Sequence, residues 1–260
     1  MTSPQVVAHR GASHDNAEHT LGAYVAALEA GADGLECDVR LTADGHLVCV
    51  HDRTLRRTTS TRGVVSTMDL ADLNELDFAS WKNPWSDLDD EAPERDEDLD
   101  RVLTLRKLLE TAADYERRVE IAIETKHPTR FGGLVERRLV ELLRDFGWDR
   151  AGAPVRVMSF SFTALQRVER AAPEVALVQL VDKLQYWSML RRVIGADWVV
   201  GPGIDLLREH PKLGARITRS GHDMHVWTVN TVADLELCQR LGVKAVITDR
   251  PAFLVDTLGR

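Results

Sequence analysis

Short β-branched runs alternate with amphipathic helical stretches along almost the whole chain, and this alternation constrains the fold more than any other feature. Strands are expected at Gln5–His9, Leu35–Leu41, Leu47–His51, Val119–Thr125, Val155–Phe160, Val175–Val181, Trp198–Gly201, His225–Val229 and Ala245–Thr248. Helices are expected at Thr20–Ala30, Leu105–Ala113, Gly133–Phe146, Ala164–Ala171, Gln185–Ile194, Leu206–Ser220, Val232–Leu241 and Ala252–Leu258. Such alternation predicts a parallel sheet. About eight strand–helix units in a chain of this length favour a closed (β/α)₈ TIM barrel over an open doubly wound sheet.

The segment 53–103 is the least regular part of the sequence. We interpret it as a small insertion after the second strand, within a single barrel domain that spans residues 1–260. We expect this insertion to cap one end of the barrel and, if the barrel is an enzyme, to select among substrates.

An acidic run at residues 87–100, inside the insertion, holds nine of the 41 acidic residues and one of the 33 basic residues. Its spacing lacks the Gly-centred pattern of a calcium-binding loop, which favours a solvated loop over a cation site. The rest of the chain carries equal numbers of acids and bases, so general binding to nucleic acid has no electrostatic support.

Targeting and cross-linking signals are sparse. No apolar run approaches the roughly 18 residues that suggest a membrane span, and the start of the chain lacks the basic and apolar regions of a secretory signal. Three scattered cysteines, Cys37, Cys49 and Cys238, form neither a disulfide framework nor a metal-binding pair. We therefore expect a cytoplasmic protein without stable membrane insertion; these features leave its oligomeric state open.

Carboxylates fall within one expected strand and at the end of another, and (β/α)₈ barrels carry their active sites at the carboxyl ends of the strands. Glu36 and Asp38 are two residues apart and share one face of a strand, as do Glu124 and Lys126. Buried like charges repel, and a divalent cation with oxygen ligands would relieve the repulsion: Mg²⁺ or Ca²⁺, with Mn²⁺ as a further candidate. The alternatives are solvated carboxylates on the rim and a plain buried ion pair between Glu124 and Lys126.

Two histidines end β-rich runs at the same functional edge. His9 and His51 are each followed by a charged residue, and two imidazoles that face one site can serve as general acid and general base. Zinc ligation is the alternative, but no His/Cys cluster has zinc spacing. The other histidines lack this context, and we expect surface or packing roles for His14, His19, His46, His127, His210, His222 and His225.

Arg10 and Lys126 add two cations near the expected acid–base and metal residues. A metal, a guanidinium and an ammonium together form a cradle for an anion, and the fork of Arg matches phosphate geometry. No nucleophile motif of the GxSxG type is present. The combination points to cleavage of a phosphoester in a small molecule.

Several segments resemble glycerophosphodiester phosphodiesterases, in the same order along nearly the whole chain. They are HRGAS at 9–13, AEHTLGAY at 17–24, GADGLECDVRLTADGHLVCVHDRTLRRTT at 31–59, IETK at 123–126, VWTVN at 226–230 and GVKAVITDRP at 242–251. The resemblance implies a (β/α)₈ barrel with an insertion after the second strand. It also implies metal-dependent hydrolysis of glycerophosphodiesters to sn-glycerol 3-phosphate and an alcohol.

Carried over residue by residue, the resemblance implies catalytic histidines at His9 and His51, metal carboxylates at Glu36, Asp38 and Glu124, and phosphate contacts at Arg10 and Lys126. Glu18 matches a glutamate that supports the Arg10 region, and Trp227 lies in a further matching motif. Ala17 stands where the family usually has proline, which should loosen that loop without removing a reactive group.

Two other functions remain open at this point. A lysophospholipase D-like or phosphoinositide-cleaving enzyme would use the same barrel with an apolar rim, which Trp81, Trp85 and Trp187 could supply. A non-catalytic protein that binds phosphate esters would have lost a histidine or a metal carboxylate, and none is missing here.

Overall fold

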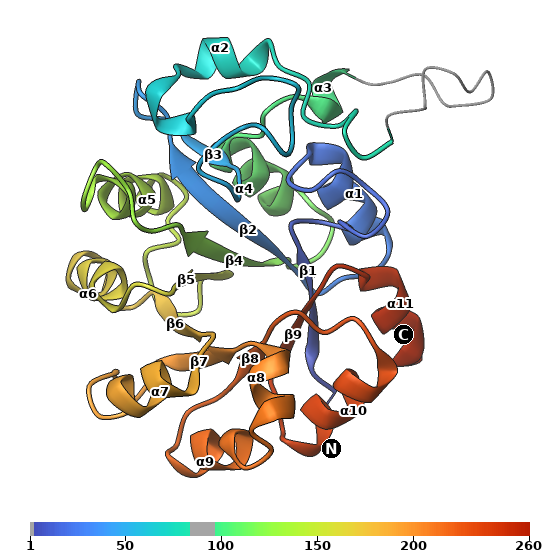
Figure 1. The fold of residues 1–260 in the computed structure, drawn as a ribbon, viewed down its shortest axis with the longest axis vertical. Coiled ribbons are helices and arrows are strands. Elements are labelled where there is room, and N and C mark those ends of the chain that lie inside the picture. Colours follow the sequence, from blue (N-terminus) through green and yellow to red (C-terminus); the bar gives the residue numbers. More distant parts are fainter. Residues whose placement is uncertain (1–2, 84–96) are drawn as a thin grey trace.

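The computed structural model describes residues 3–83 and 97–260 and has eight parallel strands in a nearly closed barrel (Figure 1). The parallel strands are β1 (Gln5–His9), β2 (Gly34–Leu41), β4 (Glu120–Thr125), β5 (Val155–Ser159), β6 (Ala176–Val181), β7 (Val199–Pro202), β8 (His225–Val226) and β9 (Ala245–Thr248), and the antiparallel β3 (Leu47–Cys49) pairs with β2. Bridges from Val200 to Met224 and from Gly203 to Trp227 join β7 to β8. The predicted (β/α)₈ barrel is confirmed.

Helices surround the strands on the outside of the barrel (Figure 1). They are α1 (Leu21–Glu29), α4 (Leu105–Ala113), α5 (Leu134–Asp145), α6 (Phe162–Ala171), α7 (Leu184–Leu190), α8 (Ile204–Glu209), α9 (Leu213–Arg219), α10 (Val232–Arg240) and α11 (Pro251–Thr257). Four helices begin where a hydroxyl oxygen accepts a backbone N–H of the first turn, an arrangement that satisfies one otherwise unpaired donor. These N-caps are Thr20, Thr104, Ser161 and Thr231.

One expected helix, Leu206–Ser220, is wrong in extent, because the structure divides it into α8 and α9. The break lies at His210 and Pro211. Proline lacks a backbone N–H and disfavours helical geometry in the residue before it, and His210 is not helical here, with φ −126° and ψ 73°.

The strand β3, expected at Leu47–His51, runs antiparallel to β2. Val39 pairs with Cys49, and the backbone N–H of Val50 donates to the carbonyl of Asp38 at 3.0 Å. The hairpin therefore extends β2 beyond the barrel wall and then returns the chain. His51 comes back to the level of Asp38 because of this reversal.

The described part of the insertion lies beside β2 and β3, at the top of Figure 1. It contains a short 3-10 helix (Val65–Thr67), α2 (Leu70–Asn74) and α3 (Glu97–Asp100). Its apolar side chains form a small core of their own with the hairpin: Val48, Val50, Leu55, Val65, Leu73, Phe78 and Val102. Most of the acidic run and Trp85 lie outside the described residues.

Two further sequence expectations concern compartment and membrane. All three cysteines are unpaired and buried. Across residues 3–83 and 97–260, no helix is both long enough and apolar enough to cross a bilayer.

Candidate active site

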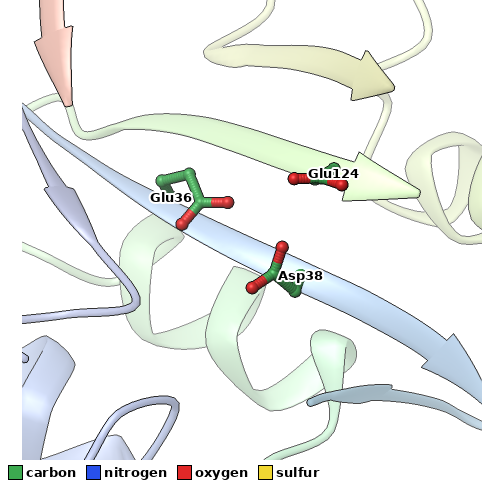
Figure 2. A group of neighbouring side chains, drawn as sticks. All are labelled: Glu36, Asp38 and Glu124. Atoms are coloured by element: carbon green, nitrogen blue, oxygen red, sulfur yellow. The ribbon is translucent and has the colours of Figure 1, made fainter. Parts of the chain in front are cut away.

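Three buried carboxylates meet inside the barrel near the carboxyl ends of β2 and β4. Glu36 and Asp38 project from β2, and Asp38 is paired in register with Glu124 of β4. Figure 2 shows the three side chains directed toward one another from the two neighbouring strands. One oxygen from each lies within 4.8 Å of the others, and all three residues are buried. Strand alternation puts Glu36 and Asp38 on one face, as the sequence predicts, and the register of β2 with β4 adds Glu124.

Two cations contact the carboxylates. Lys126 Nζ lies 2.8 Å from Asp38 Oδ1 and 2.8 Å from Glu124 Oε1. Arg10 Nε lies 3.0 Å from Asp38 Oδ2, and the Arg10 backbone N–H donates to Glu36 Oε2 at 3.1 Å. Arg10 has a φ of 59°, a strained conformation for a residue with a side chain, and it aims both its backbone N–H and its guanidinium at the cluster. Five charged residues thus form one network.

Burial and mutual repulsion shift the ionisation of these carboxyls. Burial, followed by the charge of Asp38, raises the pKa of Glu36 well above its usual range and that of Glu124 to about 7. Burial also opposes ionisation of Asp38, but its hydrogen bond to His19 and the charges of Lys126 and Arg10 hold its pKa well below the usual range. The three carboxyls cannot all be ionised comfortably with only two cations beside them.

The two predicted histidines line one pocket of about 200 Å³, together with Arg10, Glu36 and Lys126. His9 Nδ1 lies 2.6 Å from Asp249 Oδ1, and His51 Nδ1 lies 2.7 Å from Asp52 Oδ1. Hydrogen bonds, chiefly the one from His9, lower the pKa of Asp249 to about 2 although burial opposes this. An ionised aspartate requires a proton on Nδ1, so the other ring nitrogen is the one free to act as a base.

Asp249 is a site residue that the sequence did not assign. Asn230 Nδ2 donates to its Oδ2 at 2.7 Å, and Ser13 Oγ donates to its Oδ1 at 3.1 Å. Its position after β9, which pairs with β1, explains the contact with His9. The position of Asp249 after an expected strand, at the functional edge, could have marked it as a candidate. Sequence patterns cannot pair it with His9, which lies 240 positions away.

Glu18 connects Arg10, which contacts the carboxylates, with the residues that hold His51. It accepts hydrogen bonds from Arg10 at 3.2 Å and from both terminal nitrogens of Arg57 at 2.6 and 2.7 Å. Arg57 Nε in turn donates to Asp52 at 2.7 Å, and Asp52 holds His51. Burial opposes ionisation, but the hydrogen bonds from Arg57 and the charge of Arg10 lower the pKa of Glu18 to about 2. Nothing in the sequence identified Arg57.

His19 is more closely tied to the site than a general packing role suggests. Its Nε2 lies 3.0 Å from Asp38 Oδ2, and its Nδ1 lies 2.8 Å from the hydroxyl of Tyr24. The residue is buried and has a φ of 63°. His19 therefore holds Asp38 in position through this contact, and no periodicity in the sequence could have indicated it.

An apolar wall completes the pocket. Its members are Met158, Phe160, Leu180, Trp227 and Ile247. The edge of one aromatic ring meets the face of the other between Phe160 and Trp227, whose centroids are 5.5 Å apart, and Trp227 Nε1 donates to a backbone carbonyl of β7 at 2.8 Å. Trp227 thus does lie in the site.

Of the three tryptophans considered for an apolar rim, the structure excludes Trp187. Trp187 is only 2% exposed and belongs to the hydrophobic core around α7, so it is not a rim residue. Trp81 is half-buried, donates to the carbonyl of Phe78 and lies beside the cations of Arg57 and Lys82. Trp85 lies outside the described residues.

A (β/α)₈ barrel with ionisable groups gathered at the carboxyl ends of its strands has the architecture of a barrel enzyme. The family model described as "Glycerophosphoryl diester phosphodiesterase family" matches residues 9–253. The chain therefore belongs to the glycerophosphoryl diester phosphodiesterase family, a family of phosphodiesterases.

Individual relatives agree with this membership. The chain is 44% identical over 253 residues to the "Probable glycerophosphodiester phosphodiesterase 1" of Mycobacterium tuberculosis, covering 95% of this chain and 90% of that protein. It is 32% identical to a glycerophosphodiester phosphodiesterase of Bacillus subtilis over 94% of this chain and 83% of that protein.

Solved structures have the same fold. A phosphodiesterase of Oleispira antarctica, solved in complex with the product sn-glycerol-3-phosphate, has a TM-score of 0.81 at 24% identity, covering 99% of this chain and 98% of that chain. A glycerophosphodiester phosphodiesterase of Agrobacterium tumefaciens has a TM-score of 0.75 at 25% identity, covering 97% and 99%.

Proposed function

We propose that this chain hydrolyses glycerophosphodiesters to sn-glycerol 3-phosphate and an alcohol, using a divalent cation and the histidines His9 and His51. One observation carries the proposal beyond family membership. Two imidazoles, each with Nδ1 held by an aspartate, line the pocket that also contains Arg10 and Lys126. A phosphodiester that reacts there would have a proton acceptor, a proton donor and two cations within one small space.

The buried trio fits a divalent cation on grounds of charge. Glu36, Asp38 and Glu124 bring three negative charges when ionised, and Arg10 and Lys126 supply two positive ones. A divalent cation would turn the remaining negative charge into one positive charge, which the single charge of a phosphodiester neutralises. Hard oxygen ligands suit Mg²⁺, Ca²⁺ or Mn²⁺. When bound, the cation would polarise the phosphoryl oxygens and lower the pKa of a nearby hydroxyl or water.

The two histidines would divide the proton transfers. Burial, and then the charges of Lys126 and Arg10, lower the pKa of His51 to about 4, so this imidazole is neutral near pH 7. A neutral His51 is suited to take the proton of the nucleophile, either the free hydroxyl of the glycerol moiety or a water molecule. His9, when it carries a second proton on the ring nitrogen that Asp249 does not hold, would give that proton to the leaving alkoxide.

The direct test measures release of glycerol 3-phosphate from glycerophosphocholine by the purified protein. We expect turnover with Mg²⁺, Ca²⁺ or Mn²⁺, its loss on addition of a chelator, and its recovery when excess cation is restored. Glucose 6-phosphate and p-nitrophenyl phosphate serve as controls for monoester hydrolysis. Turnover that survives complete chelation would contradict the metal assignment, and no release with any of the three cations would contradict the proposed activity.

Lys126 provides a separate test of the phosphate site. Lys126→Met should raise the KM for glycerophosphocholine roughly 10–100-fold, because a hydrogen bond to a charged group contributes about 1.5–3 kcal/mol. Lys107→Met, which removes an exposed lysine of α4, should leave the KM unchanged.

Cation binding separates this role from a structural one. The Lys126→Met protein should still bind the cation, since Glu36, Asp38 and Glu124 are intact and one competing positive charge is gone. Unchanged KM and turnover in Lys126→Met would reduce Lys126 to a buried ion-pair partner of Asp38 and Glu124.

A further inference from the structure

A second pocket, of about 240 Å³, adjoins the catalytic one and shares Lys126 with it. Three segments far apart in the sequence form its wall: the end of β2 with Arg40, the insertion with Arg53 and Ser66, and the β4–α5 loop with Arg130. Arg40 shares the inward face of β2 with the carboxylates by strand alternation. The pocket therefore continues the active site outward beneath the insertion.

Lys126 is paired with Asp38 and Glu124, and the charges of Asp38, Asp52 and Glu124 act on Arg40, but the three arginines of this second pocket make no ion pair with a described residue. No Asp or Glu is among the described residues that line it. Arg40 donates through Nε and Nη2 to one backbone carbonyl, that of His51, at 2.9 and 2.7 Å. Arg130 donates to the carbonyl of Ser66 at 3.2 Å. The Arg53 side chain is exposed and makes no hydrogen bond or ion pair with a described residue.

This accumulation of charge contrasts with the rest of the molecule. The whole chain has a formal net charge of −8. Elsewhere at the site, Arg10 and Arg57 are paired with carboxylates. Three guanidinium groups around one cavity without a carboxylate repel one another, and an anionic ligand would relieve that repulsion.

A phosphodiester bound between Arg10 and Lys126 has two ester arms. The catalytic pocket, with its wall of Met158, Phe160, Trp227 and their neighbours, suits the small uncharged glycerol arm. The second arm then leads past Lys126 into the basic pocket, because Lys126 lines both cavities.

We propose that the pocket formed by Arg40, Arg53 and Arg130 is the head-group subsite, and that it selects glycerophosphodiesters whose alcohol carries a second anionic group, a phosphate or a carboxylate. This inference rests on the proposed function and names the substrate class within it. It also gives the insertion a role, since Arg53 and Ser66 belong to that segment. The guanidinium forks match both anions, so the two must be distinguished by experiment.

Three matched substrates isolate the charge of the head group. They are glycerophosphodiesters of glycerol, of glyceric acid and of glycerol phosphate, which differ only in the terminal hydroxyl, carboxylate or phosphate. Substrate loss is followed by mass spectrometry, and kcat/KM is compared. We expect roughly tenfold preference for at least one anionic substrate over the neutral one, and the larger of the two preferences identifies the anion.

Arg53 is the residue to vary, because its exposed side chain makes no hydrogen bond or ion pair within residues 3–83 and 97–260. Arg53→Gln should reduce the preference to about threefold or less, and Arg53→Glu should abolish or invert it. The value of kcat/KM for the neutral substrate should fall less than the values for the anionic substrates in both, because the neutral head group presents no anion to Arg53. Arg191→Gln/Arg192→Gln, which removes two exposed cations after α7, is the matched control and should keep the wild-type preference. Salt near 1 M, where the screening length falls to about 3 Å, should weaken the preference.

The outcomes separate the two proposals. If wild type hydrolyses none of the three substrates with any cation, the proposed function fails. If it hydrolyses the neutral substrate as well as both anionic ones, the subsite assignment alone fails. It also fails if Arg53→Glu retains the preference, or if the control double variant loses it to the same extent.

Discussion

Replacement of His9 or His51 by alanine is expected to lower turnover of glycerophosphocholine by about 10²–10⁴-fold each, while cation binding is retained. A phosphodiester needs a proton removed from the nucleophile and one delivered to the leaving alkoxide, and general acid–base assistance of each transfer typically contributes this much. The double variant should lose less than the product of the two single losses, because residues that act as a unit are not independent. The measurement is steady-state turnover, with calorimetric titration of the cation as the check on the site.

The pH dependence distinguishes the two histidines. A base must be unprotonated, so activity should be present above its pKa and lost as the pH falls through it. Burial lowers the pKa of His51 to about 4, which places the acid limb of wild-type kcat/KM well below the ordinary histidine value of about 6.5. The residual activity of His51→Ala should lack that limb.

A control variant and a thermal unfolding measurement distinguish loss of catalysis from loss of stability. His46→Ala removes an exposed imidazole of the β2–β3 turn and should leave turnover unchanged. If His9 and His51 only hydrogen-bond Asp249 and Asp52, their variants will melt at lower temperature but keep their activity in the folded fraction. Near-wild-type turnover in either folded variant would remove that histidine from the mechanism.

Replacement of Glu36 by glutamine should abolish the thermal stabilisation that a divalent cation confers, without destabilising the metal-free protein. Burial, followed by the charge of Asp38, raises the pKa of Glu36 well above its usual range, which favours the neutral carboxyl that Gln resembles. Gln Oε1 can also still accept the Arg10 backbone N–H. At a cation concentration of about 100 times Kd, wild type gains about 2.7 kcal/mol, a rise in Tm of roughly 5–10 °C. Glu36→Gln should show little of that rise, with turnover at the same concentration lowered roughly 100-fold or more.

Calorimetry and thermal unfolding of Glu36→Gln should be compared with Glu209→Gln, which changes an exposed acid of α8. The control should bind the cation and gain stability like wild type. If Glu36→Gln binds the cation as tightly as wild type, Glu36 is not a ligand and the trio is an ion-pair network with Arg10 and Lys126.

Local patterns predicted much of this architecture. The alternation of β-branched runs with amphipathic helices was sufficient for the barrel, because strand and helix periods are properties of short segments. Strand alternation was likewise sufficient to put Glu36 with Asp38 and Glu124 with Lys126. The break at Pro211 could also have been read from the sequence, since proline interrupts a helix wherever it lies in the interior.

Contacts between side chains far apart in the sequence could not be predicted from local patterns, because they depend on the complete fold. Asp249 meets His9 because β9 lies beside β1 in the barrel, and His51 reaches Asp38 because a hairpin reverses the chain. Arg57 and the arginines of the basic pocket lie in segments whose local sequence does not predict which residues they contact.

The sequence by itself therefore determined the class of fold, the side of each strand that faces inward and the edge at which the polar residues gather. The tertiary structure alone decided which of those residues touch, which histidine is held by which aspartate, and which arginines make no ion pair with the described acids. The physical reason is that hydrophobic periodicity acts within one element. Side-chain neighbours across a barrel depend instead on strand register, in which a shift of one residue would turn every side chain to the opposite face.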